Sequence, residues 1–221
     1  MKLIIQALSK YLLGLVIAIL ILFLPADGFH YWNGWLFIGL LFLPMFIVGI
    51  VLLIKNPKLL EKRLNNKEKE KPQKIVLLLS GILFIACFLV AAFDFRYGWS
   101  KLPLWIVITS SVIFFIAYLL YLEVMRENVY LSRVIEVQEN QKVIDTGLYG
   151  IVRHPMYFAA SLLFLMIPLV LGSWIAFIIM VFVPLLIVFR IKNEEEVLEK
   201  ELPGYKEYKQ KVKYKILPFL W

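Results

Sequence analysis

The apolar stretch FAASLLFLMIPLVLGSWIAFIIMVFVPLLIVF, residues 158–189, decides the topology of this chain. It is 32 residues long, and as a single helix it would measure about 48 Å. A bilayer's hydrocarbon core is only about 30 Å thick. Gly172 and Ser173 lie at its midpoint, and small residues of this kind favour a tight turn. The stretch therefore predicts a helical hairpin, with one helix over residues 155–171 and a second over 174–193.

Four further apolar blocks precede the hairpin, at residues 8–24, 32–54, 75–93 and 102–122. Hydrophobic residues make up 62% of the 221-residue chain, whereas ordinary globular domains are about half apolar. Runs of about 20 apolar residues are typical of membrane spans. We therefore predict an all-α polytopic membrane protein with about six transmembrane helices and a C-terminal helical hairpin.

The chain is expected to divide into two regions. Residues 1–122 would hold four spans, with a charged, solvated loop at residues 55–74. Residues 123–221 would hold the hairpin and a cytoplasmic tail.

The distribution of positive charge supports an even number of spans. With six spans, both termini lie on one side of the membrane, and that side carries 22 of the 24 Lys and Arg residues. The other side carries Arg96 and Lys101. Because Lys and Arg accumulate in cytoplasmic segments, we predict an integral protein of the cell membrane with both termini cytoplasmic. The same bias explains the net charge of +8 without a nucleic-acid partner.

Cysteine chemistry is not expected to contribute to the stability or the function of this chain. The single cysteine, Cys87, lies inside an apolar block, and no Cys/His cluster has metal-ligand spacing. We therefore predict neither an intrachain disulfide nor a metal site.

A group of polar residues, GLYGIVRHPMY at residues 147–157, opens the hairpin. Pro155 suits the first turn of a helix, so His154 would lie at a loop-to-helix junction beside backbone N–H groups that attract anions. Arg153 adds a permanent charge with bidentate geometry, and Tyr149 and Tyr157 can stack on a planar ring. These residue types suit a ligand with an anionic and an aromatic end. They are also typical of a basic, aromatic collar at a membrane interface.

A second polar group, RIKNEEE at residues 190–196, closes the hairpin. Arg190 and Glu194 are four residues apart and share a helix face, as in many solvated helix ends. The hairpin favours a different interpretation, because it brings His154 and Arg190 to the same face of the membrane. We expect a pocket there that combines cationic, aromatic and acidic side chains.

Together, these motifs resemble those of the isoprenylcysteine carboxyl methyltransferase family, a group of S-adenosylmethionine-dependent membrane enzymes related to phospholipid N-methyltransferases. The resemblance covers residues 128–221. It rests on an ordered set: GLY at 147–149 with RHPMY at 153–157, R-I-x-x-E-E-x-x-L at 190–198, P-G-Y-x-x-Y at 203–208, and V-x-Y-x-x-L-P at 212–218.

The resemblance implies a site for S-adenosylmethionine and a catalytic role for Arg190, which matches the arginine that faces the methyl acceptor. Two positions depart from the protein-prenyl enzymes: Gln141 stands where they have a histidine, and residues 128–132 contain no histidine. The residues expected to bind the cofactor are Gln138, Gln141, Lys142, Val143, Ile144, Gly147, Tyr149, Arg153, His154, Pro155, Met156, Tyr157, Glu194 and Glu195.

We therefore predict a membrane methyltransferase acting on a lipophilic acceptor that enters from the bilayer and is most readily the carboxylate of an isoprenylcysteine-like compound. A carboxylate needs no general base, whereas an amine must first lose a proton. Three alternatives stay open: a phospholipid or small-lipid N-methyltransferase, an NADPH-dependent membrane reductase of related architecture, and a non-enzymatic membrane scaffold.

Overall fold

The computed structural model describes residues 2–65, 68, 70–132 and 134–221. Within these ranges the chain is helical and contains no strand, which confirms the predicted all-α class. Its elements, in chain order, are α1 (Lys2–Phe23), α2 (Trp32–Lys55), α3 (Pro57–Leu64), α4 (Lys71–Tyr97), α5 (Leu104–Glu127), the 3-10 turn η1 (Gly147–Gly150), α6 (Pro155–Val170), α7 (Trp174–Met180), α8 (Phe182–Glu201) and α9 (Tyr205–Lys211).

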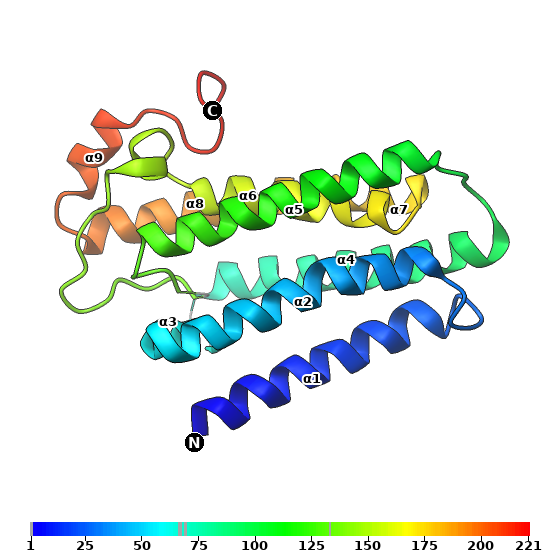
Figure 1. Cartoon of the computed structure of the whole chain (residues 1–221). Coiled ribbons are helices and arrows are strands. Elements are labelled where there is room, and N and C mark those ends of the chain that lie inside the picture. Colours follow the sequence, from blue (N-terminus) through cyan, green and yellow to red (C-terminus); the bar gives the residue numbers. More distant parts are fainter. Residues whose placement is uncertain (1, 66–67, 69, 133) are drawn as a thin grey trace.

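The long helices run side by side as an elongated bundle (Figure 1). In the described part of the chain, α1, α2, α4, α5 and the α7–α8 pair are long and apolar enough to cross a membrane, and α6 is a shorter apolar helix. Helix α6 packs along α5, while α4 contacts both α7 and α8. Both termini lie toward the same end of the bundle, as six crossings require (Figure 1).

The predicted hairpin turn is confirmed at Gly172 and Ser173. Gly172 has φ +82°, a left-handed conformation that glycine adopts without strain. A Cβ at this position would also lie 3.2 Å from the side chain of Asn33. Asn33 donates to the carbonyl of Val170 at 3.0 Å, and the Ser173 hydroxyl caps α7 by accepting from the Ala176 N–H at 3.1 Å. The turn is therefore fixed both by its own residues and by α2.

The second arm of the hairpin is divided at Val181, between α7 and α8. Pro184 explains the division, since proline has no N–H to donate to the carbonyl four residues earlier, that of Met180. The two short helices together form one crossing over residues Trp174–Glu201.

A buried carboxylate ties the turn of the hairpin to α4. Asp94 is 1% exposed and accepts hydrogen bonds from the hydroxyls of Ser173, at 2.5 Å, and Ser100. The Ser100 N–H donates to the other Asp94 oxygen at 2.6 Å. This polar cluster closes the end of the bundle that lies opposite the two termini.

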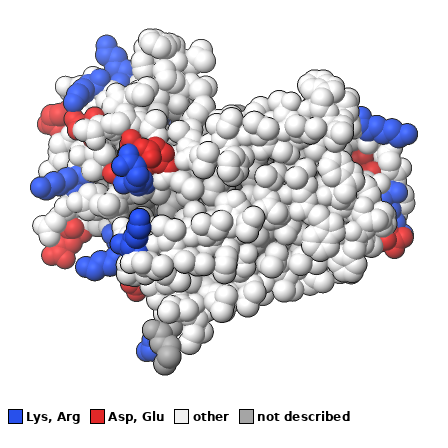
Figure 2. All heavy atoms as spheres, in the orientation of Figure 1, with Lys and Arg blue, Asp and Glu red and all other residues white. Residues whose placement is uncertain are grey.

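Charged side chains gather at the two ends of the molecule, and the face between them is uncharged (Figure 2). This distribution matches a protein whose middle is surrounded by lipid. Trp32, Trp35, Trp99, Trp105 and Trp174 remain 41–66% exposed, as expected for aromatic side chains that face lipid or the membrane interface.

The segment at residues 55–74 is not a continuous loop, as the sequence had suggested. Pro57 begins α3, and the side chain of Asn56 caps it by accepting from the Leu59 N–H at 3.1 Å. Leu59 and Leu60 are buried, so this helix packs against the bundle. Residues 66–67 and 69 of the predicted loop lie outside the described residues.

Candidate active site

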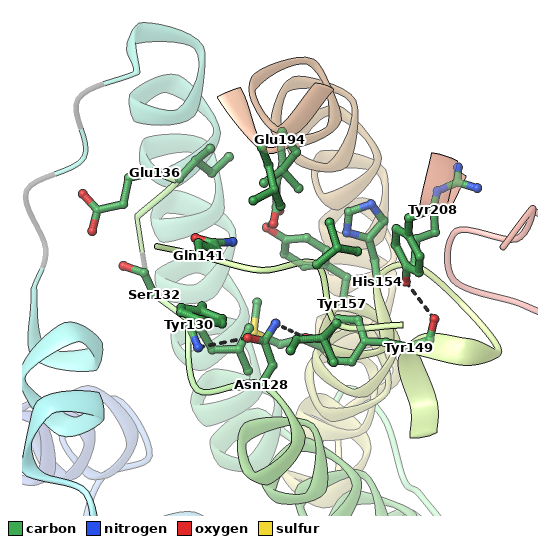
Figure 3. Close-up of a pocket in the computed structure, with 18 of the residues that line it drawn as sticks. Asn128, Tyr130, Ser132, Glu136, Gln141, Tyr149, His154, Tyr157, Glu194 and Tyr208 are labelled. Atoms are coloured by element: carbon green, nitrogen blue, oxygen red, sulfur yellow. Dashed lines mark hydrogen bonds between the residues drawn. The ribbon is translucent and has the colours of Figure 1, made fainter. Parts of the chain in front are cut away.

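A pocket opens at the charged end of the bundle that carries the termini (Figure 3). One wall is the extended stretch between α5 and η1, and the other is formed by η1, the start of α6 and the last turns of α8. The hairpin thus brings His154 and Arg190 into one cavity.

The pocket lining contains many of the residues singled out from the sequence. Arg190 lies in its wall, together with Gln141, Lys142, Val143, Ile144, Tyr149, Arg153, His154, Met156, Tyr157 and Glu194. Gln138, Gly147, Pro155 and Glu195 lie outside the lining.

The Tyr157 hydroxyl joins the two arms of the hairpin inside the pocket. It donates to Glu194 Oε2 at 2.5 Å and accepts from Arg190 Nε at 2.8 Å. Because α6 carries Tyr157 and α8 carries the two charged residues, this network fixes the relative positions of the arms. Glu194 is partly exposed to the cavity.

Arg153 and His154 hold the C-terminal tail against the hairpin. The Arg153 guanidinium donates to the carbonyls of Val212 and Lys213, both at 2.7 Å. The backbone N–H groups of Arg153 and His154 donate to the carbonyls of Tyr214 and Lys215, at 2.9 and 2.8 Å. The RHP motif therefore pairs with the tail through its backbone as well as through the Arg153 side chain.

Glu195 is the buried counter-ion of this arrangement. Its Oε1 accepts from Arg153 Nε at 2.8 Å and lies 3.2 Å from His154 Nε2. Its Oε2 is 3.6 Å from Lys209 Nζ and 3.5 Å from Lys215 Nζ. With a side chain only 5% exposed, Glu195 supports the pocket from behind, and the geometry gives it an electrostatic and structural role.

Tyr149 closes the aromatic side of the pocket. Its hydroxyl accepts from Asn128 Nδ2 at 3.0 Å, and its carbonyl accepts from the Tyr208 hydroxyl at 2.7 Å (Figure 3). Burial raises the pKa of both tyrosine hydroxyls above the usual value. Both groups therefore stay protonated at neutral pH and act as fixed hydrogen-bonding groups.

The remaining predicted residues shape the pocket from outside its lining. Gln138 Nε2 donates to the Tyr130 carbonyl at 2.6 Å, and its backbone N–H donates to Gln141 Oε1 at 2.9 Å. Gly147 has φ +55°, and a Cβ there would come within 1.9 Å of a Glu127 carboxylate oxygen. Pro155 is the first residue of α6.

Several lining residues were not predicted as site residues. The stretch at 128–136 contributes Asn128, Tyr130, Leu131, Ser132, Val134, Ile135 and Glu136, and the C-terminal elements contribute Leu198, Leu202 and Tyr208. The motifs at 190–198 and 203–208 contain Leu198 and Tyr208, so their spacing was a usable signal. The 128–136 stretch has no periodicity that marks its residues as pocket-facing.

Residues from the N-terminal half also reach the site. Gln73 on α4 contacts Arg190, and Glu68 accepts from the N–H of the lining residue Ile135 at 3.3 Å. Lys62 on α3 hydrogen-bonds Gln138 Oε1. The site therefore extends beyond the C-terminal region that carries the motifs.

This architecture, a bundle of long apolar helices with a polar and aromatic pocket at one end, is that of an integral membrane protein with a candidate ligand site. Residues 105–203 match the model of the family described as phospholipid methyltransferase. The matched region begins in α5 and ends just after α8, so it contains the hairpin and most of the pocket lining. The match indicates an integral membrane methyltransferase. No curated protein matches the chain.

Proposed function

We propose that this protein transfers a methyl group from S-adenosylmethionine to the headgroup of a membrane lipid at the cytoplasmic face of the membrane. The observation that carries the proposal is the Tyr157 network. It places a guanidinium and a carboxylate side by side in a pocket at the membrane boundary, within the region that matches a methyltransferase family.

The chemistry of the lining fits the proposed cofactor. When bound, S-adenosylmethionine supplies an electrophilic methyl group on a cationic sulfur. The Glu194 carboxylate suits hydroxyl and ammonium donors and balances positive charge. Tyr130 and Tyr149 offer ring faces for a planar heterocycle, and His154 lies at the N-terminus of the 16-residue helix α6, which suits an anionic group.

The contribution of this chain to methyl transfer is positioning. Holding two reactants in line and close together supplies about 7–11 kcal/mol in favourable cases. The two arms of the hairpin are joined through Tyr157, and the tail is joined to them through Arg153. These connections fix the positions of the pocket walls relative to one another.

The charges near Arg190 favour a zwitterionic headgroup as the acceptor. Arg190 suits a phosphate, and Glu194 supplies a carboxylate beside it in the pocket lining. The buried Glu68 carboxylate lies behind the lining, with Oε2 4.0 Å from the Arg190 guanidinium. A phosphate at Arg190 would direct an amine toward Glu194. The amine's proton would leave to water at the pocket mouth before transfer. The printed description of the matched family supports the same lipid class.

A carboxylate acceptor of the isoprenylcysteine type is the second candidate. Arg190 at the pocket wall would orient its carboxylate, which needs no base. The ordered motifs at residues 147–157 and 190–198 support this acceptor.

Purified protein in detergent with tritiated S-adenosylmethionine tests both candidates. Phosphatidylethanolamine and N-acetyl-S-farnesylcysteine are supplied in parallel, and products are identified by mass spectrometry. We expect label in the phospholipid and about tenfold less with Tyr157→Phe, which keeps the ring and loses the hydroxyl. Tyr97→Phe, at an exposed position far from the pocket, is the control. Label only in the farnesyl compound would favour the second candidate, and label in neither would overturn the proposal.

A further inference from the structure

Gln73 is an unexpected polar residue in the bundle. It lies on the first turns of α4, a helix that is apolar over most of its length, and its side chain is completely buried. A buried amide stays stable only when its hydrogen bonds are satisfied. Gln73 lies outside the region that matches the methyltransferase family, which begins at residue 105.

Both polar atoms of the Gln73 side chain contact Arg190. Gln73 Oε1 accepts from Arg190 Nη1 at 3.2 Å, and Gln73 Nε2 donates to the Arg190 carbonyl at 3.5 Å. The Gln73 amide therefore bridges the guanidinium and the backbone carbonyl of Arg190, and this bridge restricts the rotamers that Arg190 can adopt.

The other two nitrogens of the guanidinium are held from different elements. Arg190 Nε donates to the Tyr157 hydroxyl of α6 at 2.8 Å, and Nη2 lies 4.0 Å from the Glu68 carboxylate that precedes α4. Side chains from three segments thus set the plane of the guanidinium, which is 12% exposed in the pocket wall.

We propose that Gln73 is a positioning residue that orients Arg190 toward the anionic group of the methyl acceptor. The proposal rests on the function proposed above. A guanidinium recognises phosphate or carboxylate through a planar fork, so its orientation determines how well it binds. Because Gln73 contacts Arg190 and does not line the pocket, it acts through the arginine and leaves the cofactor side of the site intact.

Two variants separate positioning from packing. Gln73→Leu keeps a similar volume and removes both hydrogen bonds. Gln73→Glu keeps an oxygen that accepts from Arg190 Nη1. Gln6→Leu, the same change at an exposed position of α1, is the matched control.

Steady-state kinetics with phosphatidylethanolamine in mixed micelles is the first measurement. We expect Gln73→Leu to raise KM for the lipid about tenfold, with the affinity for S-adenosylhomocysteine by calorimetry within twofold of the parent. Gln73→Glu should restore KM to within threefold. An unchanged KM in Gln73→Leu overturns the inference. A parallel loss of affinity for S-adenosylhomocysteine also overturns it, because that result would mean that Gln73 supports the packing of the whole site and does not act through Arg190.

A second measurement requires no acceptor and separates this inference from the proposed function. Phenylglyoxal modifies accessible guanidinium groups, and the rate at Arg190 is followed by mass spectrometry. We expect Gln73→Leu to accelerate it at least fivefold, with Gln73→Glu close to the parent and Gln6→Leu unchanged. Equal rates in all proteins overturn the positioning role. If the parent protein methylates neither lipid and Gln73→Leu still labels faster than the parent, the result supports the positioning role of Gln73 and contradicts only the proposed acceptors.

Discussion

Arg153 and Glu195 form a buried ion pair at 2.8 Å although they are 42 positions apart in the chain. The pair joins the loop before α6 to the C-terminal part of α8. It also fixes the tail, because the same guanidinium donates to two tail carbonyls. One ion pair therefore connects three segments that surround the pocket.

Replacing Glu195 with alanine should strongly destabilise the protein. Removing one partner of a buried pair leaves the other charge uncompensated, at a cost of about 3–5 kcal/mol. We expect a lower unfolding temperature in detergent and faster proteolysis near residues 212–215. Glu196→Ala, one position along at an exposed site, should change neither. Similar melting of both variants would contradict the role assigned to Glu195.

Replacing Glu194 with glutamine should act on the cofactor instead. The amide keeps the size of the side chain but loses its charge, so we expect the affinity for S-adenosylhomocysteine to fall about tenfold, equivalent to about 1.4 kcal/mol. Unfolding temperature should change little. Calorimetry on this variant, with Glu196→Gln as its control, measures the effect, and an unaltered affinity would exclude Glu194 from the cofactor site.

Ser173→Ala should lower the stability of the bundle without changing ligand binding in the pocket. It removes a hydrogen bond to the buried Asp94 carboxylate and the cap of α7, and losses of this kind cost about 1–3 kcal/mol. The melting temperature should fall while the affinity for S-adenosylhomocysteine stays within twofold. Ser9→Ala, at an exposed position of α1, should leave both unchanged. A large drop in affinity at constant stability would show that the far end of the bundle controls the site.

Alkaline pH should release the tail. Burial raises the pKa of Tyr208 and Tyr149 in the folded protein, whereas in the unfolded chain a tyrosine ionises near pH 10. The folded state therefore holds these protons more tightly. The associated stability is complete below about pH 10 and is lost as pH rises toward the folded-state values. Unfolding temperature between pH 8 and 11 measures this, and Tyr208→Phe should flatten the decline. If the unfolding temperature of the parent and of this variant falls equally with pH, Tyr208 does not contribute to the pH dependence.

The sequence predicted the hairpin because its signals are local. An apolar stretch too long for one crossing, with Gly172 and Ser173 in its middle, leaves few alternatives to a turn. The hairpin in turn indicated that His154 and Arg190 would meet in one pocket, and both residues line it.

Contacts between distant segments were beyond such local signals. Gln73 lies at the end of the predicted charged loop, between Lys71 and Lys74, and nothing in its neighbourhood indicates an arginine 117 positions away. Likewise, the sequence marks Arg153 and Glu195 as cofactor-binding residues, but it gives no sign that they pair with each other and hold the tail. Helix α3 was missed because four of its eight residues are charged, and the pattern of two buried leucines is too short to indicate a helix.

The contact between Gln73 and Arg190 has a consequence for engineering. The C-terminal part of this chain that carries the hairpin and most of the pocket lining is not a self-contained cassette, because a residue that holds Arg190 is encoded more than 100 positions upstream. A chimera that grafts the hairpin and tail onto a different N-terminal bundle would need to carry α4 along, or supply an equivalent amide at the same depth.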